Sequence, residues 1–582
     1  MGVPGFFAWL LKNYKKNEII QKNLEKKIKI LYIDANCLFH PQCFKILESF
    51  PDLTDNITKL ESYMIRRIIN YINFLIKYTN PEIVYIAVDG VAPLAKIAQQ
   101  RKRRFKSTQD NLLKENIKKK YNIPFNNSWS NIKITPGTEF MEKIHSEIYK
   151  YIKKTQKTQF IYSSYHTPGE GEHKILEDIR KRTNLLNNSD IYVIYGLDAD
   201  LIFLSMAANK EQNIYLLRES SHLDGRDNHG ELYDPIDDVI EELKYVSIDQ
   251  TKMCYNQQIK EIINKKASLN LELNLELNLN FTNDFIFLCY LLGNDFLPHL
   301  PSIDIKKGGL DFLIECYTDV YIMTQQNLIY YEKNKIKINY IILTEILKLC
   351  SNKESYYFTK ILPESLNKLD KKKCPFQDNY KKEIWDLDNL KNINRHAYNN
   401  IINLGTGKPH EWKSRYYNYY FNNNNNNIIN NICKNYFEGL EWVTKYYFEG
   451  PPTWLWQYKY THAPFISDLY NYIKYNKVNI KFKKEGPLKP CVQLLCVLPP
   501  ACHQELPKEY QVLVLNKDSP IKSMFPEPED IKIDYINKEL LYQCDLLVPY
   551  LDINIITETC SKIELSKTSN ILNKICCEYK FS

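Results

Sequence analysis

Acidic residues recur directly after short apolar segments in the first 300 residues of this chain. Seven carboxylates follow the pattern: Asp34, Asp89, Glu170, Glu172, Asp198, Asp200 and Asp295. If they gather at one place, their mutual repulsion requires cations between them, and oxygen ligands are the preference of a hard ion such as Mg²⁺. Two such ions about 4 Å apart activate a water molecule and neutralise the leaving oxygen of a phosphodiester.

The segments that precede these acids have the character of buried parallel strands. Short, apolar, β-branched runs predict strands at Lys29–Ile33, Ile83–Val88, Phe160–Ser164 and Ile191–Tyr195. Segments of helical length alternate with them, for example Leu60–Tyr78, and Asp295 follows a predicted apolar helix at Asp284–Leu292. The alternation predicts an α/β fold with a mostly parallel sheet, whose strand carboxyl ends form the ligand-binding edge. The alternative is that each acid caps a helix or forms a turn, although four successive strand ends carry one.

A basic segment follows the second predicted strand. If it is helical from about Pro93, four polar side chains share one face: Lys96, Gln100, Arg103 and Arg104. Guanidinium groups bind phosphate oxygens in a planar fork, and lysine adds a compact charge. We expect this face to bind a terminal phosphate beside the metal site. A solvated basic face and a nuclear import signal at Arg101–Arg104 are the alternative interpretations.

Composition sets the broad class. The 582 residues exceed one ordinary domain, and the net charge of +8 is compatible with a polyanionic partner or with plain surface solubility. The opening Met1–Phe7 has no signal-peptide pattern, and no run approaches the roughly 18 apolar residues of a membrane span. We therefore expect an intracellular chain with reduced thiols. The spacing of Cys491, Cys496, Cys502 and His503 fits no standard zinc pattern.

Taken in order along the chain, the motifs resemble the Xrn family of 5′→3′ exoribonucleases, which is related to the flap endonucleases. The matching segments are Met1–Pro4, Tyr32–Asn36 with His40-Pro41, Val88–Pro93, Thr135–Thr138, Pro168–His173, Gly196–Leu201, Leu217–Glu219, Gly293–Pro301, Arg415–Tyr417, Tyr436–Trp442, Thr453–Asp468, Pro487–Pro500 and Asp518–Pro520. Leu94 departs from the pattern, because the family usually has a basic residue there. We expect a catalytic core without the long C-terminal extensions of larger members.

The resemblance implies a role for each matching position. The seven acids would hold two Mg²⁺ ions, for which Mn²⁺ could substitute, and Lys96, Gln100, Arg103 and Arg104 would bind a 5′-monophosphate. His40 and either Trp454 or Trp456 would stack on the leading bases, which suits an enzyme indifferent to sequence. Without the resemblance, the tryptophans would be assigned to an aromatic core and His40 to a structural role.

The implied fold is a flap-endonuclease-like nuclease core, wrapped by an extended helical, aromatic-rich C-terminal region. Residues 1–350 would form the core with the metal site and the phosphate pocket, interrupted by a low-complexity insertion at about 265–280, within which Leu269–Asn280 alternates Leu with Asn or Glu. Residues 351–410 would be a variable linker, and residues 411–582 would complete the active site. The asparagine tract at 422–427 is predicted to be a solvated loop.

The implied activity is processive, sequence-independent hydrolysis of single-stranded RNA with a 5′-monophosphate, in RNA decay. We expect a monomer, and of the cytoplasm and the nucleus we favour the cytoplasm. The Met1-Gly2 segment and the tryptophan-rich region would narrow the entrance. Two alternatives are a structure-specific flap-type DNA endonuclease, whose helical arch and DNA-binding hairpin are not visible in the sequence, and an inactive RNA-binding scaffold. A phosphatase with an Asp nucleophile would need an Asp-x-Asp pair at the first strand, where Asp34 is followed by Ala35-Asn36.

Overall fold

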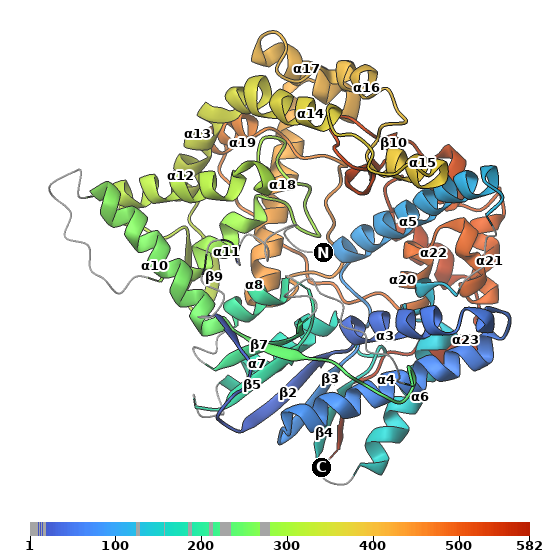
Figure 1. Ribbon diagram of the computed structural model, residues 1–582. Helices are drawn as coiled ribbons and strands as arrows, with labels where there is room; N and C mark the ends of the chain where they lie inside the picture. The colour runs from blue at the N-terminus through green and yellow to red at the C-terminus, as the bar shows by residue number, and fades with distance from the viewer. Residues whose placement is uncertain are drawn as a thin grey trace.

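The computed structural model describes residues 19–123, 129–155, 158–183, 189–198, 200–208, 213–220, 234–267 and 280–581, together with residues 10, 12 and 14. An eight-stranded sheet lies at its centre, in the order β1-β7-β6-β5-β2-β3-β4-β12 (Figure 1). The strands are β1 Ile20–Gln21, β2 Ile28–Asp34, β3 Ile83–Ala87, β4 Gln159–Ser163, β5 Ile191–Tyr195, β6 Ile214–Glu219, β7 Leu243–Ser247 and β12 Tyr579–Phe581.

The middle of the sheet is parallel and its edges are antiparallel. β6, β5, β2, β3 and β4 run parallel to one another, whereas β1 and β7 at one edge and β12 at the other are antiparallel to their neighbours. The chain lays β3 and β4 on one side of β2 and then places β5 on the other side. The strand order therefore reverses between β2 and β5, and such a switch point opens a crevice at the carboxyl ends of the strands.

The four strands predicted from the sequence are confirmed, with each boundary within one residue of its predicted place. β5 coincides with its predicted range, β3 ends one residue earlier, β4 begins and ends one residue earlier, and β2 extends one residue further at each end. All five side chains of β3 are buried, as expected of a strand covered on both faces. The mostly parallel sheet is thus confirmed.

Helices cover both faces of the sheet (Figure 1). On one face α3 (Ala35–Ser49), α4 (Ile57–Thr79) and α6 (Glu139–Lys154) bury their apolar sides against the strands. On the other face lie α7 (Gly171–Thr183), α8 (Asp200–Ala207), α10 (Ile248–Ala267) and α11 (Thr282–Tyr290). Thus α4 contains the predicted helix at 60–78, and α11 is displaced by two residues from the predicted 284–292.

The long helix α5 (Leu94–Lys120) leaves the sheet after Pro93 and enters the C-terminal region, where it packs against α20 (Pro490–Val497). Arg101 anchors this contact: its guanidinium is buried and donates to the carbonyl oxygens of Cys496 and Met524. One residue of the predicted basic run is therefore a structural anchor, which does not suit an exposed import signal.

The remaining chain is mainly helical and rich in aromatic residues, as predicted. Its helices are α12 Gly309–Thr324, α13 Tyr340–Tyr356, α14 Leu362–Asp370, α15 Asn379–Asp388, α16 Arg395–Ile402, α17 Pro409–Phe421, α18 Asn426–Phe448, α19 Ile466–Tyr475, α21 Lys508–Leu515, α22 Ile553–Ser561 and α23 Lys567–Leu572. Two hairpins accompany them, β8–β9 (Ile329–Glu332, Lys335–Ile338) and β10–β11 (Ile533–Asp534, Asp545–Leu546). The chain ends on the sheet, where β12 pairs with β4 (Figure 1).

The loop at the asparagine tract is shorter than the predicted 422–427, because it ends at Asn425. Asn422 ends α17 in a left-handed conformation (φ 55°), and the Asn425 side chain accepts a hydrogen bond from the backbone N–H of Ile428 at the start of α18. Asn426 and Asn427 already belong to that helix, because asparagine is a favoured N-cap and can adopt positive φ. The Leu/Asn alternation lies outside the described residues except for Asn280. No described helix is both long and apolar enough to span a bilayer.

Candidate active site at the carboxyl ends of the parallel strands

Asp34 and Asp89 face each other across the start of α7. Asp34 ends β2, and Asp89 follows β3 and accepts a hydrogen bond from the backbone N–H of Gly171 at 2.7 Å. A Cβ atom on Gly171 would lie 3.0 Å from Oδ1 of Asp34 and 3.4 Å from Oδ1 of Asp89. The glycine therefore keeps open the space into which both carboxylates project.

Lys96 joins two further acids of the predicted set. Its Nζ lies 2.5 Å from Oε2 of Glu170 and 2.8 Å from Oδ2 of Asp295, and all three side chains are largely buried. The other oxygen of Glu170 accepts a hydrogen bond from the Tyr446 hydroxyl at 2.5 Å. Ligand atoms of Glu170, Glu172 and His173 lie within 4.8 Å of one another. Segments from α5, α7, α18 and the loop after α11 thus meet at one point.

The carboxylates perturb one another. Burial and the neighbouring Asp89 and Asp198 raise the pKa of Asp34 to about 8. Burial and Glu170 likewise raise the pKa of Asp89. Burial alone would raise the pKa of Asp295, but the Lys96 ammonium lowers it below its ordinary value. One ammonium therefore compensates only part of the negative charge, and the remaining buried oxygens suit a divalent cation.

The last two acids complete the edge at the switch point. Asp198 follows β5, is exposed to solvent and is close enough to Asp34 to affect its pKa. Asp200 is the first residue of α8, and its side chain lies outside the described part of the structure. Met1-Gly2 also lies outside it.

The predicted phosphate-binding face of α5 carries buried polar atoms. Oε1 of Gln100 and Nε of Arg104 are both buried without a hydrogen-bond partner among the described residues, while Arg103 is exposed. Burial, with Arg103 and Arg104 nearby, lowers the pKa of His40 to about 4. His40 therefore lies beside this face as a neutral imidazole. Lys96 was predicted to belong to the same face, but its ammonium instead pairs with Glu170 and Asp295.

The two tryptophans differ in their surroundings. Trp456 stacks on the buried Trp442, with ring centroids 5.4 Å apart and an angle of 22° between the planes. Trp454 is half-buried, and its carbonyl oxygen accepts a hydrogen bond from the backbone N–H of Leu94 at 2.7 Å. Leu94 is buried in the apolar cluster of the C-terminal region. Trp454 thus lies at the first turn of the helix that carries the basic face.

Three residues that the sequence analysis did not single out support the acids. The buried Lys174 ammonium donates to the carbonyl oxygens of Val88 (2.6 Å) and Ser164 (2.9 Å), and burial lowers its pKa to about 7. The Asn36 side-chain oxygen accepts a hydrogen bond from the Asp89 backbone N–H. Asn36 is the last residue of the matching segment Tyr32–Asn36, and Lys174 directly follows Pro168–His173. Tyr446 gave no signal, because it contacts Glu170 across 276 positions.

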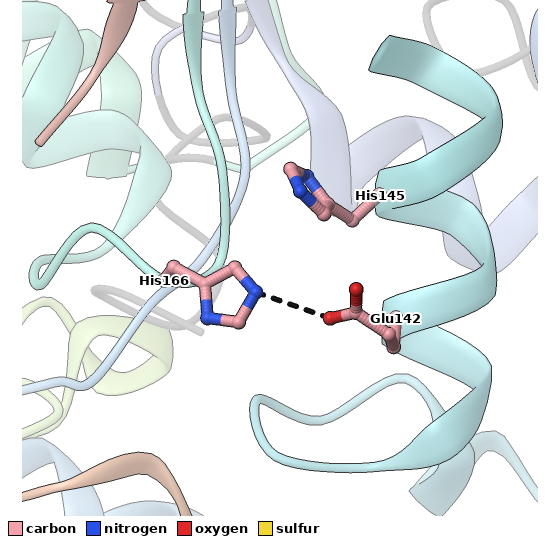
Figure 2. A group of neighbouring side chains, drawn as sticks. All are labelled: Glu142, His145 and His166. Carbon is pink, nitrogen blue, oxygen red and sulfur yellow. Dashed lines mark hydrogen bonds and ion pairs between the residues drawn. The ribbon is translucent and has the colours of Figure 1, made fainter. Parts of the chain in front are cut away.

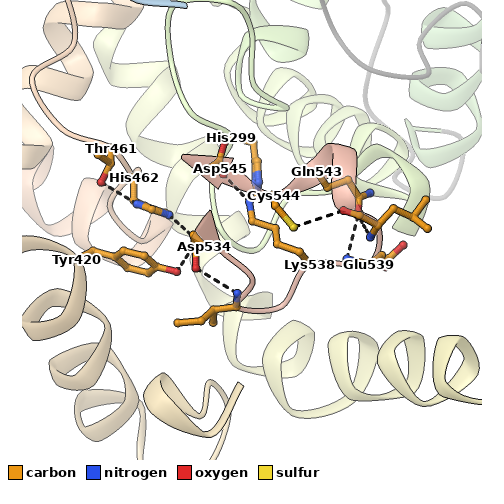
Figure 3. Close-up of polar contacts among 12 residues, drawn as sticks. His299, Tyr420, Thr461, His462, Asp534, Lys538, Glu539, Gln543, Cys544 and Asp545 are labelled. Carbon is orange, nitrogen blue, oxygen red and sulfur yellow. Dashed lines mark hydrogen bonds and ion pairs between the residues drawn. The ribbon is translucent and has the colours of Figure 1, made fainter. Parts of the chain in front are cut away.

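A cavity of about 610 Å³ adjoins the site along α5, and Asp295 and Arg103 are among its lining residues. Three other lining residues contact one another: Asp534 accepts a hydrogen bond from the Tyr420 hydroxyl (2.9 Å) and lies 3.2 Å from Nε2 of His462 (Figure 3). Lys538 pairs with Asp545 at 2.6 Å in the same group. The cavity is therefore lined by aromatic rings and by cations that are partly neutralised.

Cys491 and Cys496 are buried thiols of the C-terminal apolar cluster, where burial raises their pKa values to about 12. Thiols held protonated in an apolar core do not suit a zinc site.

Two family patterns match this sequence. The family model described as XRN 5′-3′ exonuclease N-terminus matches residues 1–220. The family model described as Xrn1 helical domain matches residues 278–373 and 359–573. The human protein named 5′-3′ exoribonuclease 1 is 30% identical over 95% of this chain, and the Schizosaccharomyces pombe protein of that name is 28% identical over 95%. The Arabidopsis thaliana 5′-3′ exoribonuclease 2 is 27% identical over 99%. The chain spans 33%, 48% and 68% of these three relatives, respectively.

Proposed function

The chain belongs to the XRN family of 5′-3′ exonucleases, and from that premise we propose that it hydrolyses RNA from the 5′ end and releases mononucleotides. The observation that carries the proposal is the meeting of Asp34, Asp89, Glu170 and Asp295 around the start of α7, directly beside the polar face of α5. Relatives named 5′-3′ exoribonuclease support the same activity.

The seven acids of the site would hold the divalent metal. Their donors are all carboxylate oxygens, the preference of Mg²⁺ with Mn²⁺ as its substitute, and the buried pair Asp34 and Asp89 is short of positive charge. Two bound ions would supply an activated water and neutralise the leaving oxygen. Lys96 pairs with Glu170 and lowers the pKa of Asp295, and Tyr446 fixes the orientation of Glu170.

The polar face of α5 would receive the 5′-monophosphate. Nε of Arg104 and Oε1 of Gln100 are buried and have no hydrogen-bond partner among the residues that the structure describes. A ligand can satisfy them, since buried polar atoms are rarely left without partners. Arg103 adds an exposed charge. A pocket that closes around a monophosphate at this face would exclude a triphosphate or a cap by its bulk.

Single-stranded RNA would be held by stacking. His40 is neutral at physiological pH and lies beside the phosphate-binding face, so its ring is free of charge for a base to cover. Of the two candidate tryptophans we favour Trp454, because Trp456 already stacks on Trp442. After each cut the new 5′-phosphate would move to the α5 face, which makes the reaction processive. We further propose a monomer that acts in the cytoplasm in RNA decay.

The experiment that tests the proposal compares a linear RNA carrying a 5′-monophosphate with a circular RNA of the same sequence, both with Mg²⁺. An exonuclease degrades the linear RNA and leaves the circle intact. Cutting of the circle would instead support an endonuclease, and binding of both without hydrolysis would support an RNA-binding scaffold.

A further inference from the structure

A second group of metal-ligand side chains lies outside the carboxylate site. Glu142 and His145 are one turn apart on α6, and His166 lies in the loop after β4 (Figure 2). One ligand atom from each of the three residues lies within 4.8 Å of the others. His166 is largely buried, whereas Glu142 is 27% exposed. The group therefore has access to solvent on one side.

The hydrogen bonds of His166 leave its second nitrogen facing a carboxylate. Nδ1 lies 2.9 Å from the carbonyl oxygen of Lys574, which can only accept, so Nδ1 carries a proton. Nε2 lies 3.1 Å from Oε2 of Glu142. Two acceptors this close need a proton or a cation between them. In a tetrahedral zinc site with bonds of about 2.0–2.2 Å, neighbouring ligand atoms are about 3.4 Å apart, so the pair already has nearly the required spacing.

Each of the three side chains is also oriented by a second protein group. The Tyr165 hydroxyl donates to Oε2 of Glu142 at 2.5 Å, and the Tyr162 hydroxyl lies 3.1 Å from Nδ1 of His145. The Lys574 carbonyl fixes the tautomer of His166. Metal-binding histidines and carboxylates are commonly held by such outer hydrogen bonds, which fix the ring and the tautomer that binds the ion.

The other clusters of possible ligands already contain an ammonium group. Lys96 pairs with Glu170 in one, and Lys538 pairs with Asp545 in the other. Among the residues that the structure describes, Glu142 pairs with His166 and with no lysine or arginine. Its other oxygen, Oε1, accepts no hydrogen bond from any residue that the structure describes. Of these clusters, the group of Glu142, His145 and His166 is therefore the one in which a bound cation would compensate a carboxylate charge that no neighbouring lysine or arginine of the described residues compensates.

We propose that Glu142, His145 and His166 bind one divalent transition-metal ion, of which Zn²⁺ is the best fit, with water as the remaining ligand. Two imidazoles and one carboxylate are a ligand set suited to Zn²⁺, whereas Mg²⁺ prefers oxygen ligands alone. The site would thus be distinct in ion preference from the carboxylate site that we assign to catalysis.

Such an ion would hold three parts of the chain together. The carbonyl oxygen of His166 accepts a hydrogen bond from the backbone N–H of Cys576, just before β12 pairs with β4. The same loop continues to Gly169, which exchanges backbone hydrogen bonds with Gly90 and Val91, next to Asp89. The ion would therefore clip the C-terminal segment and α6 to the loop that leads to Glu170, and its role would be structural.

The test measures metal binding by the full-length chain. Protein freed of transition metals and kept in excess Mg²⁺ is titrated with Zn²⁺ by calorimetry, and the zinc retained after gel filtration is counted by elemental analysis. Co²⁺ in a parallel sample reports imidazole ligation through its visible absorption. We expect about one Zn²⁺ per chain in the wild type, an increase in melting temperature on addition of Zn²⁺, and affinity at least about tenfold weaker in His145→Gln and His166→Gln.

Matched variants keep the test decisive. Glu142→Gln preserves the shape of the side chain and leaves one oxygen that can accept the hydrogen bond from Tyr165, so it should fold and still lose the ion. His410→Gln, which removes an exposed imidazole at the start of α17, and Asp89→Asn, in the carboxylate site, should both retain one Zn²⁺. A wild type that retains no Zn²⁺ in Mg²⁺ buffer, or a folded His166→Gln that retains as much as the wild type, would overturn the proposal.

Discussion

The ammonium of Lys96 lies 2.8 Å from the carboxylate of Asp295, although 199 positions separate them in the sequence. This ion pair joins the first turn of α5, from which the phosphate-binding face extends, to the acids at the switch point of the sheet. The two side chains are only 14% and 5% exposed, so the pair lies inside the protein and links the proposed phosphate-binding face to the proposed metal site.

Removal of the Lys96 charge should damage both stability and activity. Lys96→Met removes the ammonium that pairs with the buried carboxylates of Glu170 and Asp295, and breaking a buried pair in this way costs about 3–5 kcal/mol. We expect a lower melting temperature in EDTA that Mg²⁺ partly restores, as measured by thermal unfolding. Lys114→Met is the control, since Lys114 is exposed further along α5 and pairs with Asp388. Equal effects of the two substitutions would contradict the assigned role.

The stability of the metal-free protein should fall as pH rises from about 5 to 8. Asp34 has a folded-state pKa of about 8, against an ordinary value of 3.8, so in this range the folded state holds a proton that the unfolded state has released. Stability is then lost with rising pH, by at most about 1.4 kcal/mol per pH unit from this group. Denaturant unfolding in EDTA at several pH values measures the slope. Asp34→Asn should flatten it, and a wild-type slope equal to that of the variant would refute the explanation.

Substitution of Arg104 should reduce activity on RNA with a 5′-monophosphate far more than activity on RNA without a 5′-phosphate. A charge-assisted hydrogen bond contributes about 1.5–3 kcal/mol, so Arg104→Gln should lower kcat/KM on 5′-monophosphate RNA by about 10- to 150-fold. Activity on 5′-hydroxyl RNA should change far less, because that substrate never makes the contact. Arg66→Gln, at an exposed position on α4, serves as the control. If Arg104→Gln slowed both substrates equally, phosphate recognition by this residue would be wrong.

Substitution of each tryptophan should distinguish the ring that stacks on RNA from the ring that stacks in the protein core. Trp456→Ala removes a ring packed on Trp442 and should cost about 3–5 kcal/mol of folding free energy. Trp454→Ala should leave the melting temperature nearly unchanged and reduce kcat/KM on single-stranded RNA by the equivalent of about 1–3 kcal/mol. Steady-state kinetics and thermal unfolding on both variants provide the comparison. The reverse pattern would assign the base contact to Trp456.

The strands and the acids that end them could be predicted because both depend on local pattern. Apolar β-branched runs define β2 to β5, and the position of Asp34 or Asp89 at a strand end follows from the run itself. The contact between Tyr446 and Glu170 could not be predicted in this way, because it depends on how α18 packs over the sheet. The same holds for Lys96, whose helical spacing predicted the phosphate-binding face but whose ammonium lies among the acids.

The asparagine tract shows a different limit. Its composition indicated a solvated loop, whereas Asn425 caps α18 and the next two asparagines continue as helix. Capping depends on one side-chain hydrogen bond to the backbone, which composition does not reveal. Burial of Arg101 is similar. A basic run predicts exposure, whereas this guanidinium donates to the carbonyl oxygens of Cys496 and Met524 and lies over the rings of Phe105 and Phe525.

One measurement tests the proposed function most directly. A single-stranded RNA labelled at its 5′-terminal nucleotide is prepared with a 5′-monophosphate or a 5′-triphosphate and incubated with Mg²⁺, with EDTA, and with the Asp89→Ala variant. We predict that labelled mononucleotide is released from the monophosphate RNA alone, and that EDTA and Asp89→Ala both abolish its release. Internal fragments, or equal release from the two 5′ ends, would contradict a metal-dependent exonuclease that recognises the 5′-monophosphate.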